Sequence, residues 1–452
     1  MFDRTQAPIE AEKIPFQIPE IENFTLANGI EVYFVQKRNL PIVYLTAFAS
    51  GGSRYDSTDK LGTAYLTSLL IDEGAGEFNA LQLNDEFEKI GTNFNVSVNP
   101  DTIGFSMLSL SENFTDSLNL FCKVLTNPRF EQPDFEREKK KVLDRILQLK
   151  DEAGYIASSV FERMIFKNSF YEFPEIGYSE TVGNISNDDI KNFYQNRFGT
   201  THVKFFIVGN LETQNAAELL NKQFGFWKTQ TNSSTNFAKL SRQITKYFVV
   251  DKKDSAQSEI RVGHISKRRN TEDFYATKIM NTILGGQFSS RINLNLRENK
   301  GFTYGAGSNF SYYQNAGLFE VHTAVNIQNT GAAVKEIFNE LTGIKNGITE
   351  KEIEFAKSTL IKQYPSRFET FSQIAKNIES LVVHSIPLDE LKVYEDKLFS
   401  VTNEEIHNAA VDNIFPEESF VVICGEKESV NKQLKDELGV DAVELTHEGT
   451  QM

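Results

Sequence analysis

Residues 42–74 read IVYLTAFASGGSRYDSTDKLGTAYLTSLLIDEG, and this stretch decides the fold. The apolar run 42–50 predicts a buried strand, and the pair Gly51 and Gly52 predicts a turn after it. Residues 58–73 have the apolar spacing of a short amphipathic helix. A strand that leads directly into a helix indicates a unit of mixed α and β structure.

This stretch begins a longer unit that occurs twice. The first half continues with a helix ending at Gly91, two strands, two helices and a closing strand that ends at Gly209. The second half repeats this order from a strand at 258–265 to a closing strand that ends at Gly425. Gly91 has a counterpart in Gly301, 210 positions later, and each follows a predicted helix, where glycine supplies the left-handed residue of a C-cap. Equal order at nearly equal spacing indicates gene duplication.

The repeat predicts two homologous domains, and a chain of 452 residues is also too long for one ordinary core. We expect the first domain at 1–228, a linker at 229–245 and the second domain at 246–452. The linker is indicated by the polar stretch TQTNSSTN that begins at Thr229.

Composition narrows the possible partners. The net charge of −15 argues against nucleic acid and against an anionic membrane surface. Cys122 and Cys424 each lie in an apolar stretch, which is typical of buried free thiols. No apolar run approaches the ~18 residues of a membrane span, and the start at 1–13 lacks the apolar segment of a signal peptide. We expect a soluble protein, cytoplasmic or periplasmic.

Four separated segments carry a family resemblance: LANGIEVYFVQ from Leu26, GGSRYDSTDKLGTAYLTSLLIDEG from Gly51, DFEREKKKVLDRI from Asp134, and LGGQFSSRINLNLRENKGFTYGAGS from Leu284. In this order they resemble the pitrilysin/insulinase family of zinc peptidases. The resemblance implies an α+β fold of two homologous domains, each an antiparallel sheet with helices packed on one face. It also implies that two such chains, or one of double length, close over a peptide.

The family's inverted zinc motif, H-x-x-E-H, supplies two imidazoles and a general base. Aligned with it, this chain has Tyr65 and Leu69 at the ligand positions and Ser68 at the base position. The family's third ligand, a glutamate on a later charged helix, aligns with Arg145. A guanidinium has no lone pair to give a metal, and zinc needs three or four N, S or carboxylate ligands. We therefore predict no metal site and no cofactor in this chain, with zinc held by a partner subunit.

The second half keeps the family's pair of an arginine at a helix end and a tyrosine seven residues later. These are Arg297 and Tyr304, and we expect Tyr304 just inside the next strand. By resemblance they are catalytic and substrate-binding residues: a protonated hydroxyl can donate to the oxyanion formed at a zinc centre, and arginine can hold a substrate carbonyl or carboxylate. In the internal repeat their counterparts are Phe87 and Phe94, which fit a core or sheet role.

Three hypotheses follow. In the first, the chain is the non-catalytic subunit of a heterodimeric zinc endopeptidase and supplies Arg297 and Tyr304 in trans to a peptide at the zinc of a homologous H-x-x-E-H subunit. In the second, it is a catalytically inactive peptide-binding or scaffold protein, possibly a homodimer. In the third, it is a self-sufficient peptidase with an unusual metal site; His264 and His322, in predicted strands of the second half, are the histidines that would have to meet.

Overall fold

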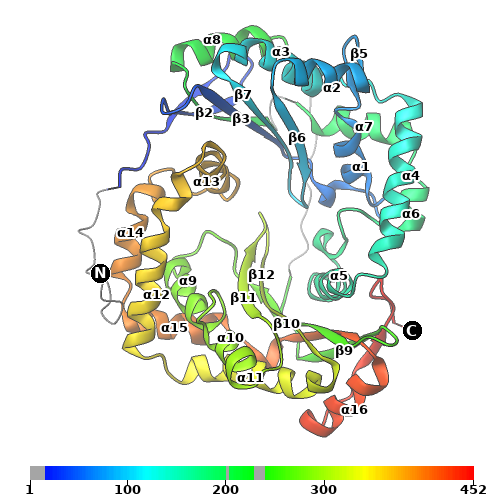
Figure 1. The fold of residues 1–452 in the computed structure, drawn as a ribbon, viewed down its shortest axis with the longest axis vertical. Coiled ribbons are helices and arrows are strands. Elements are labelled where there is room, and N and C mark those ends of the chain that lie inside the picture. The colour runs from blue at the N-terminus through cyan, green and yellow to red at the C-terminus, as the bar shows by residue number, and fades with distance from the viewer. Residues whose placement is uncertain (1–15, 200–202, 229–239, 452) are drawn as a thin grey trace, which may run out of the picture.

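The structure is a computed structural model that describes residues 16–199, 203–228 and 240–451. The first half lies above the second in Figure 1, and each half is built around its own six-stranded sheet. Most of the predicted linker, residues 229–239, lies outside the described residues, as do His202 and the start of the chain at 1–15. The predicted domain boundaries therefore stay a prediction.

The first sheet has the strand order β1-β2-β8-β3-β7-β6, and the helices of the first half cover one of its faces. Its strands are β1 (Glu22–Thr25), β2 (Glu31–Gln36), β3 (Ile42–Ala49), β6 (Asn93–Val98), β7 (Ile103–Leu110) and β8 (Val203–Gly209). The helices of this half are α1 (Thr63–Leu70), α2 (Ala80–Lys89), α3 (Phe114–Thr126), α4 (Gln132–Leu149), α5 (Ala153–Ile165), α6 (Ser179–Gly183), α7 (Asn187–Arg197) and α8 (Thr213–Phe224), and a small hairpin joins β4 (Gly74–Ala75) to β5 (Phe78–Asn79).

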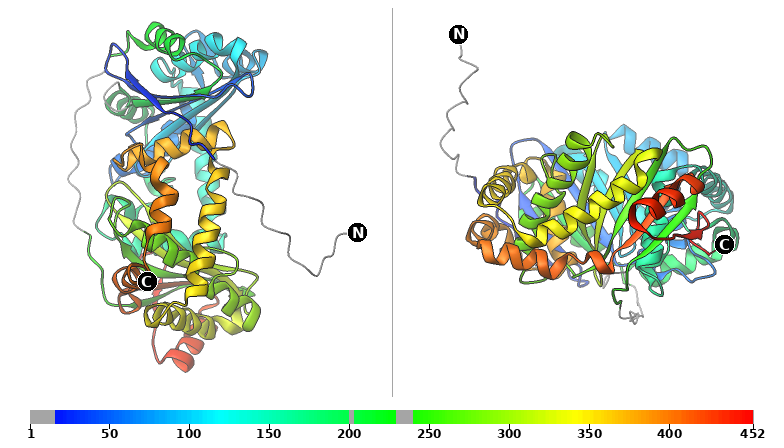
Figure 2. Two further views of the ribbon diagram at one scale, coloured as in Figure 1. Left: turned by 90° about the vertical axis from the view of Figure 1, so that its left-hand side faces the viewer. Right: turned by 90° about the horizontal axis from the view of Figure 1, so that it is seen from below.

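The second sheet repeats this arrangement in the order β11-β12-β10-β13-β9-β14. Its strands are β9 (Lys246–Asp251), β10 (Gln257–Ser266), β11 (Ala306–Tyr312), β12 (Gly317–Asn326), β13 (Phe420–Gly425) and β14 (Val443–Leu445). The helices are α9 (Phe274–Leu284), α10 (Arg291–Asn293), a π-helix (Leu294–Asn299), α11 (Thr330–Asn346), α12 (Glu350–Gln363), α13 (Phe371–Val383), α14 (Glu390–Ser400), α15 (Asn403–Asn413) and α16 (Lys427–Leu438). Figure 2 shows α12 and α14 side by side, extending from the second half toward the first.

The predicted α+β fold of two similar units is confirmed, and the order of strands shows the repeat directly. The sheets are mixed rather than purely antiparallel. In the first half the closing strand β8 lies between β2 and β3, which run in opposite directions, so it is antiparallel to β3 and necessarily parallel to β2. In the second half β13 takes the same place between β10 and β9. A parallel pair needs a long crossover, which the helices of each half provide.

The two halves exchange one helix each. Helix α5 of the first half packs on the second sheet, where Val160 and Phe161 share a core with Val422 and Phe420. Helix α13 of the second half packs in turn on the first sheet, where Ile378 shares a core with residues of β3 and β8 (Figure 1). The expectation of helices on one face is therefore incomplete, because the opposite face of each sheet is covered by a single helix from the other half.

Both cysteines are buried and unpaired, as predicted, and burial raises the pKa of each thiol to about 11. Among the described residues, every helix falls short of the length and apolarity needed to cross a membrane.

Candidate functional site

Helix α1 is well formed although it carries no motif ligand. It begins at Thr63 after Gly62, whose φ of 98° is in the left-handed region that glycine tolerates. The buried carboxylate of Asp56 accepts the backbone N–H groups of Gly62 at 2.8 Å and of Ala64 at 2.9 Å, which would otherwise lack partners at the helix start. Burial raises the pKa of Asp56 to about 7 despite these bonds.

The four side chains that align with the zinc ligands and the general base make contacts within the fold. Tyr65 and Leu69 are half-buried and pack against the core of the first half. The Ser68 hydroxyl donates to the carbonyl of Tyr65 at 2.7 Å, within the same helix. The Arg145 side chain is 46% exposed, and its guanidinium pairs with Glu152 at 2.6 Å. The Arg145 side chain, which aligns with the family's third zinc ligand, is thus engaged in an ion pair with Glu152.

The buried face of α4 carries one carboxylate, Glu138, which is already paired with Arg137 and Lys141; its other buried residues are apolar. Within residues 16–199, 203–228 and 240–451, no three His, Cys, Asp or Glu side chains gather in a way that could hold a metal ion. Tyrosine, serine, leucine and arginine do not form the N, S or carboxylate set that zinc requires. These residues therefore do not fit the zinc that the fold family implies.

The two histidines of the second sheet do not form a substitute site. His322 in β12 pairs with Arg261 in β10. Arg261 is three residues from His264, so the two imidazoles project from opposite faces of the sheet. His264 is buried; its Nε2 accepts the N–H of Phe415 at 3.1 Å, and its Nδ1 lies 3.0 Å from the carbonyl of Ile265. Burial lowers the pKa of His264 to about 4, so it is a neutral core histidine.

Arg297 lies in the last turn of the π-helix, at the helix end that the sequence predicts. Its guanidinium lies over the ring of Phe288, 4.4 Å from the ring centroid, and its Nε is 3.4 Å from a carboxylate oxygen of Glu298. The Phe288 side chain is itself 67% exposed. A partly exposed cation on an exposed ring forms a surface that can hold the carbonyl or carboxylate of a ligand.

Tyr304 lies in a bend two residues before β11, not inside the strand as expected. Its side chain is 94% exposed. The loop around it is fixed: the N–H of Phe302 donates to the carbonyl of Leu296 at 2.9 Å, and the N–H of Ala306 donates to Asn293 Oδ1 at 3.0 Å. Within the described part of the chain, the Tyr304 hydroxyl makes no hydrogen bond, so it is available to a ligand.

Gly301 lets the chain turn between these two residues, with the left-handed φ of 65° that its predicted place after a helix requires. Among the described residues, no hydrogen bond, ion pair or ring contact joins Arg297 to Tyr304. Sequence reasoning missed Phe288 and Asn293, the ring beneath the arginine and the amide that fixes the tyrosine loop. Both lie in the quoted segment from Leu284, but nothing in a sequence pattern distinguishes an exposed phenylalanine from a core one.

The counterparts of the pair in the first half are structural, as predicted. Phe87 and Phe94 stack with their ring centroids 5.4 Å apart, and both pack into the core of the first half. The second half therefore exposes an arginine and a tyrosine where the first half buries two rings.

Fold and site together define a chain built like a two-domain metallopeptidase in which the metal-binding positions carry no donors. The family profile described as "Insulinase (Peptidase family M16)" matches residues 32–174, and the one described as "Peptidase M16 inactive domain" matches residues 184–360. The chain belongs to the M16 (insulinase) peptidase family. The finer assignment, to a subunit that lacks H-x-x-E-H but keeps the Arg297 and Tyr304 pair, stays a prediction.

Relatives of this chain are named in two different ways. A Rickettsia felis protein named as an uncharacterized zinc protease is 24% identical over 343 residues, which cover 75% of this chain and 82% of that protein. A Helicobacter pylori protein named as a non-peptidase homolog is 24% identical over 384 residues, which cover 84% of this chain and 88% of that protein. The names thus include both a zinc protease and a non-peptidase homolog.

Two solved structures share the fold. The Pseudomonas fluorescens structure described as a peptidase M16 inactive domain has a TM-score of 0.85 at 22% identity, covering 90% of this chain and 98% of that chain. A Helicobacter pylori structure described as a protease has a TM-score of 0.81 at 21% identity, covering 90% of this chain and 100% of that one.

Proposed function

We propose that this chain is the non-catalytic subunit of a heterodimeric zinc endopeptidase, and that it supplies Arg297 and Tyr304 in trans. The observation that carries the proposal is the 94% exposed Tyr304 on a loop fixed by hydrogen bonds, in a chain whose metal positions hold Tyr65, Leu69 and Arg145. A loop held in place without a partner for its tyrosine suits a residue whose ligand comes from outside the chain.

In this proposal the homologous partner carries the H-x-x-E-H motif and the zinc, which would polarise the peptide carbonyl when bound. The Tyr304 hydroxyl donates a hydrogen bond to the oxyanion. The Arg297 guanidinium orients the substrate through a neighbouring carbonyl or carboxylate. The nonpolar face of Phe288 limits the directions that the guanidinium can take.

The test is to mix the purified chain with an H-x-x-E-H subunit encoded in the same genome and to measure peptide hydrolysis. Removing one oxyanion donor costs ~10²–10³ in rate, so Tyr304→Phe should lower kcat of the mixture by about that factor. Tyr65→Phe is the matched control, because it removes a hydroxyl at the degenerate metal position, and it should leave kcat unchanged. An unchanged rate with Tyr304→Phe would overturn the trans role.

The second candidate is a catalytically inactive peptide-binding or scaffold protein. It is favoured by the Helicobacter pylori relative, which is named as a non-peptidase homolog. The two candidates differ in the mass of the complex: the first expects a heterodimer with the H-x-x-E-H subunit in size-exclusion chromatography with light scattering, and the second expects the chain to remain alone or to pair with itself.

A further inference from the structure

A cavity of about 340 Å³ lies between α9, α13 and α14, with Tyr312 of β11 in its wall. Three cationic side chains line it: Arg269 from the loop before α9, Lys278 from α9 and Arg367 from the turn before α13. They come from positions almost 100 residues apart, and the fold alone brings them together. Such a concentration of positive charge is unexpected in a chain with a net charge of −15.

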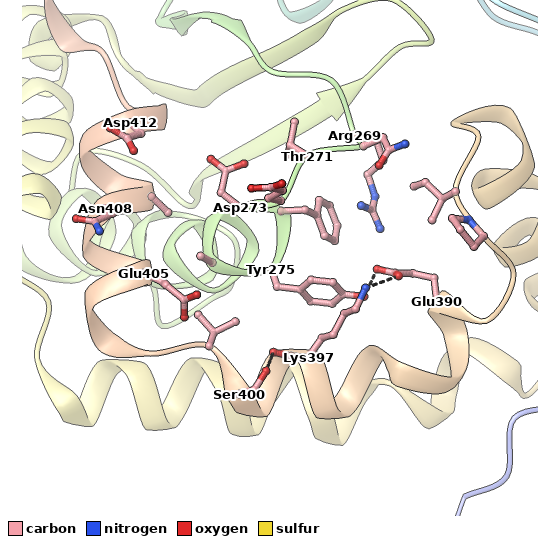
Figure 3. Close-up of a pocket in the computed structure, with 18 residues that line it drawn as sticks. Arg269, Thr271, Asp273, Tyr275, Glu390, Lys397, Ser400, Glu405, Asn408 and Asp412 are labelled. Carbon is pink, nitrogen blue, oxygen red and sulfur yellow. Dashed lines mark hydrogen bonds and ion pairs between the residues drawn. The ribbon is translucent and has the colours of Figure 1, made fainter.

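The negative charge at this cavity is already engaged. Among the described residues that line it, Glu390 is the one carboxylate. Its two oxygens receive the Lys397 ammonium at 2.6 Å and the Tyr275 hydroxyl at 2.5 Å. Figure 3 shows this arrangement from the adjoining cavity, with Lys397 and Glu390 joined and the Arg269 side chain directed into the space beside them. The positive charge of Arg269, Lys278 and Arg367 is therefore not neutralised by Glu390.

The two guanidinium groups are held in place by aromatic rings and an amide. Arg269 lies over the ring of Phe274, 3.0 Å from the centroid. Arg367 donates to Asn377 Oδ1 at 2.6 Å, and its guanidinium carbon lies 5.5 Å from the ring centroid of Tyr394. Fixed guanidinium groups present N–H donors in a planar geometry that matches carboxylate and phosphate oxygens. Their orientation is thus set before any ligand arrives.

Lys278, the third cation, lies near two aromatic rings. Its Nζ lies 5.2 Å from the ring centroid of Tyr394 and 5.8 Å from that of Phe274. Within the parts of the chain that the structure describes, this ammonium has neither a hydrogen bond nor an ion pair. Burial, with the nearby charges of Arg367 and Arg269, lowers the pKa of Lys278 to about 7. A half-buried cation without a counter-ion costs stability, so the arrangement gains nothing for folding.

A neighbouring cavity of about 590 Å³ shares Arg269 and His384 with the first. Its lining adds Arg268 and Lys204, and the described residues around it include no carboxylate. Lys204 is paired with Glu31, so its positive charge is partly neutralised before any ligand binds. This second space is bounded by both halves, by Phe48 of β3 and by the turn after β11. It adjoins the cationic cavity at Arg269 and His384, where residues of the two halves meet.

We propose that the cavity lined by Arg269, Lys278 and Arg367 binds an oxyanion, a carboxylate or phosphate group, that enters from between the two halves. The two arginines take the oxygens in two-point fashion, and the ammonium of Lys278 completes the charge balance. The inference does not depend on the proposed partner subunit. The same chemistry has two sources, a free phosphate compound or the carboxyl terminus of a peptide.

The pH behaviour of the cavity follows from the groups that face Lys278. They come from every element packed around it: Arg269, Tyr312, Arg367, His384, Glu390 and Tyr394. Burial raises the pKa of Tyr312 to about 12 and also raises that of Tyr394, burial lowers the pKa of His384, and the bonds to Lys397 and Tyr275 lower that of Glu390 despite burial. At pH 8 the two tyrosines, His384 and Glu390 keep one charge state, while Lys278 is largely neutral in the empty cavity. An oxyanion draws a proton onto it.

The test is isothermal titration calorimetry of the full chain at pH 8 with inorganic pyrophosphate, with an acidic peptide ending in a free carboxylate, and with the same peptide amidated at its C-terminus. We expect saturable binding with uptake of up to one proton, measured in buffers of different ionisation enthalpy. Binding of pyrophosphate alone identifies a free phosphate ligand. Binding of the peptide that is lost on amidation identifies a C-terminal carboxylate.

Two variants make the result specific to the cavity. Lys278→Met should weaken binding at least tenfold and abolish proton uptake, and Arg367→Gln should weaken binding at least tenfold. Lys392→Met is the matched control, because it removes an exposed lysine from α14 outside the cavity, and it should bind as the parent chain does. The proposal is overturned if none of the three probes binds, or if all variants bind them equally.

Discussion

Asp101 Oδ2 accepts the backbone N–H of Gln314 at 2.8 Å, and this bond joins the loop after β6 in the first half to the turn after β11 in the second. Asp101 also pairs with the buried guanidinium of Arg54, whose Nη2 donates to Gln314 Oε1 at 2.8 Å. The Tyr171 hydroxyl donates to the same carboxylate at 2.8 Å. A buried ion pair of the first half is thus hydrogen-bonded to a turn of the second half.

Asp101→Asn should destabilise the chain by about 3–5 kcal/mol, because it leaves Arg54 buried without its anion. Gln314→Ala removes a side-chain acceptor while the backbone N–H remains, and should cost only about 1 kcal/mol. Urea unfolding followed by circular dichroism measures both. Equal losses for the two variants would mean that the Arg54 and Asp101 pair is not what secures this contact.

Phe161→Ala on α5 should cost about 3–5 kcal/mol, since the ring is fully buried in the core that α5 shares with the second sheet. Because α5 belongs to the first half, the loss should affect both halves together. Fluorescence of Trp227, the one tryptophan of the chain, reports on the first half, and circular dichroism reports on the whole. The two signals should shift to the same lower urea concentration; separate transitions would contradict the shared core.

Glu162→Gln should make stability less dependent on pH. Burial, with the nearby charges of Glu175 and Glu320, raises the pKa of Glu162 to about 8. The native chain therefore binds a proton that the unfolded chain releases above an ordinary pKa of about 4.3, so stability falls as pH rises from there through 8. The variant should exceed the parent by about 1–3 kcal/mol at pH 8.5 and match it near pH 4. Glu180→Gln, at an exposed position of α6, should behave as the parent does at both pH values.

Lys278→Met should have the opposite dependence on pH. The pKa of Lys278 is lowered to about 7 in the native chain, and an unfolded lysine titrates near 10.4. Between these values the unfolded chain binds the extra proton, so parental stability rises with pH. The variant should be more stable than the parent by about 1–3 kcal/mol at pH 6.5, with a gain that shrinks toward pH 10. Thermal melts of Lys278→Met and Lys392→Met across this range supply the comparison.

Chelator treatment should leave the melting temperature of the isolated chain unchanged, because Tyr65, Leu69 and Arg145 offer zinc no suitable donors. Elemental analysis after dialysis against zinc should find well below one ion per chain. One tightly held ion, lost together with several degrees of melting temperature on chelation, would contradict this reading of α1 and α4.

The fold was largely predictable because its information is local and repeated. Apolar periodicity and the glycines at 91 and 301 fixed the order of elements, and the repeat showed that one unit occurs twice. The exchange of α5 and α13 was not predictable, since an amphipathic pattern states that a helix face is buried but not which sheet buries it. The parallel pairing of β8 with β2 likewise depends on strands far apart in the chain.

The site was predictable only in its residue types. Sequence motifs singled out Arg297 and Tyr304, but not the ring of Phe288 or the start of β11 two residues after Tyr304. The direction of the Arg145 side chain depends on Glu152, one turn beyond the helix that carries it. The cationic cavity left no sequence signal at all, because Arg269, Lys278 and Arg367 become neighbours only through tertiary packing.

The exchanged helices have an evolutionary consequence. If either half were produced alone, one face of its sheet would lose the helix that covers it, and a bare apolar sheet face invites association. An ancestral single-length protein would thus have had to assemble in pairs, each copy lending a helix to the other. Gene duplication would have joined two such copies in one polypeptide. Each half would then be retained because its helix covers the other sheet, even after its own metal-binding residues are lost.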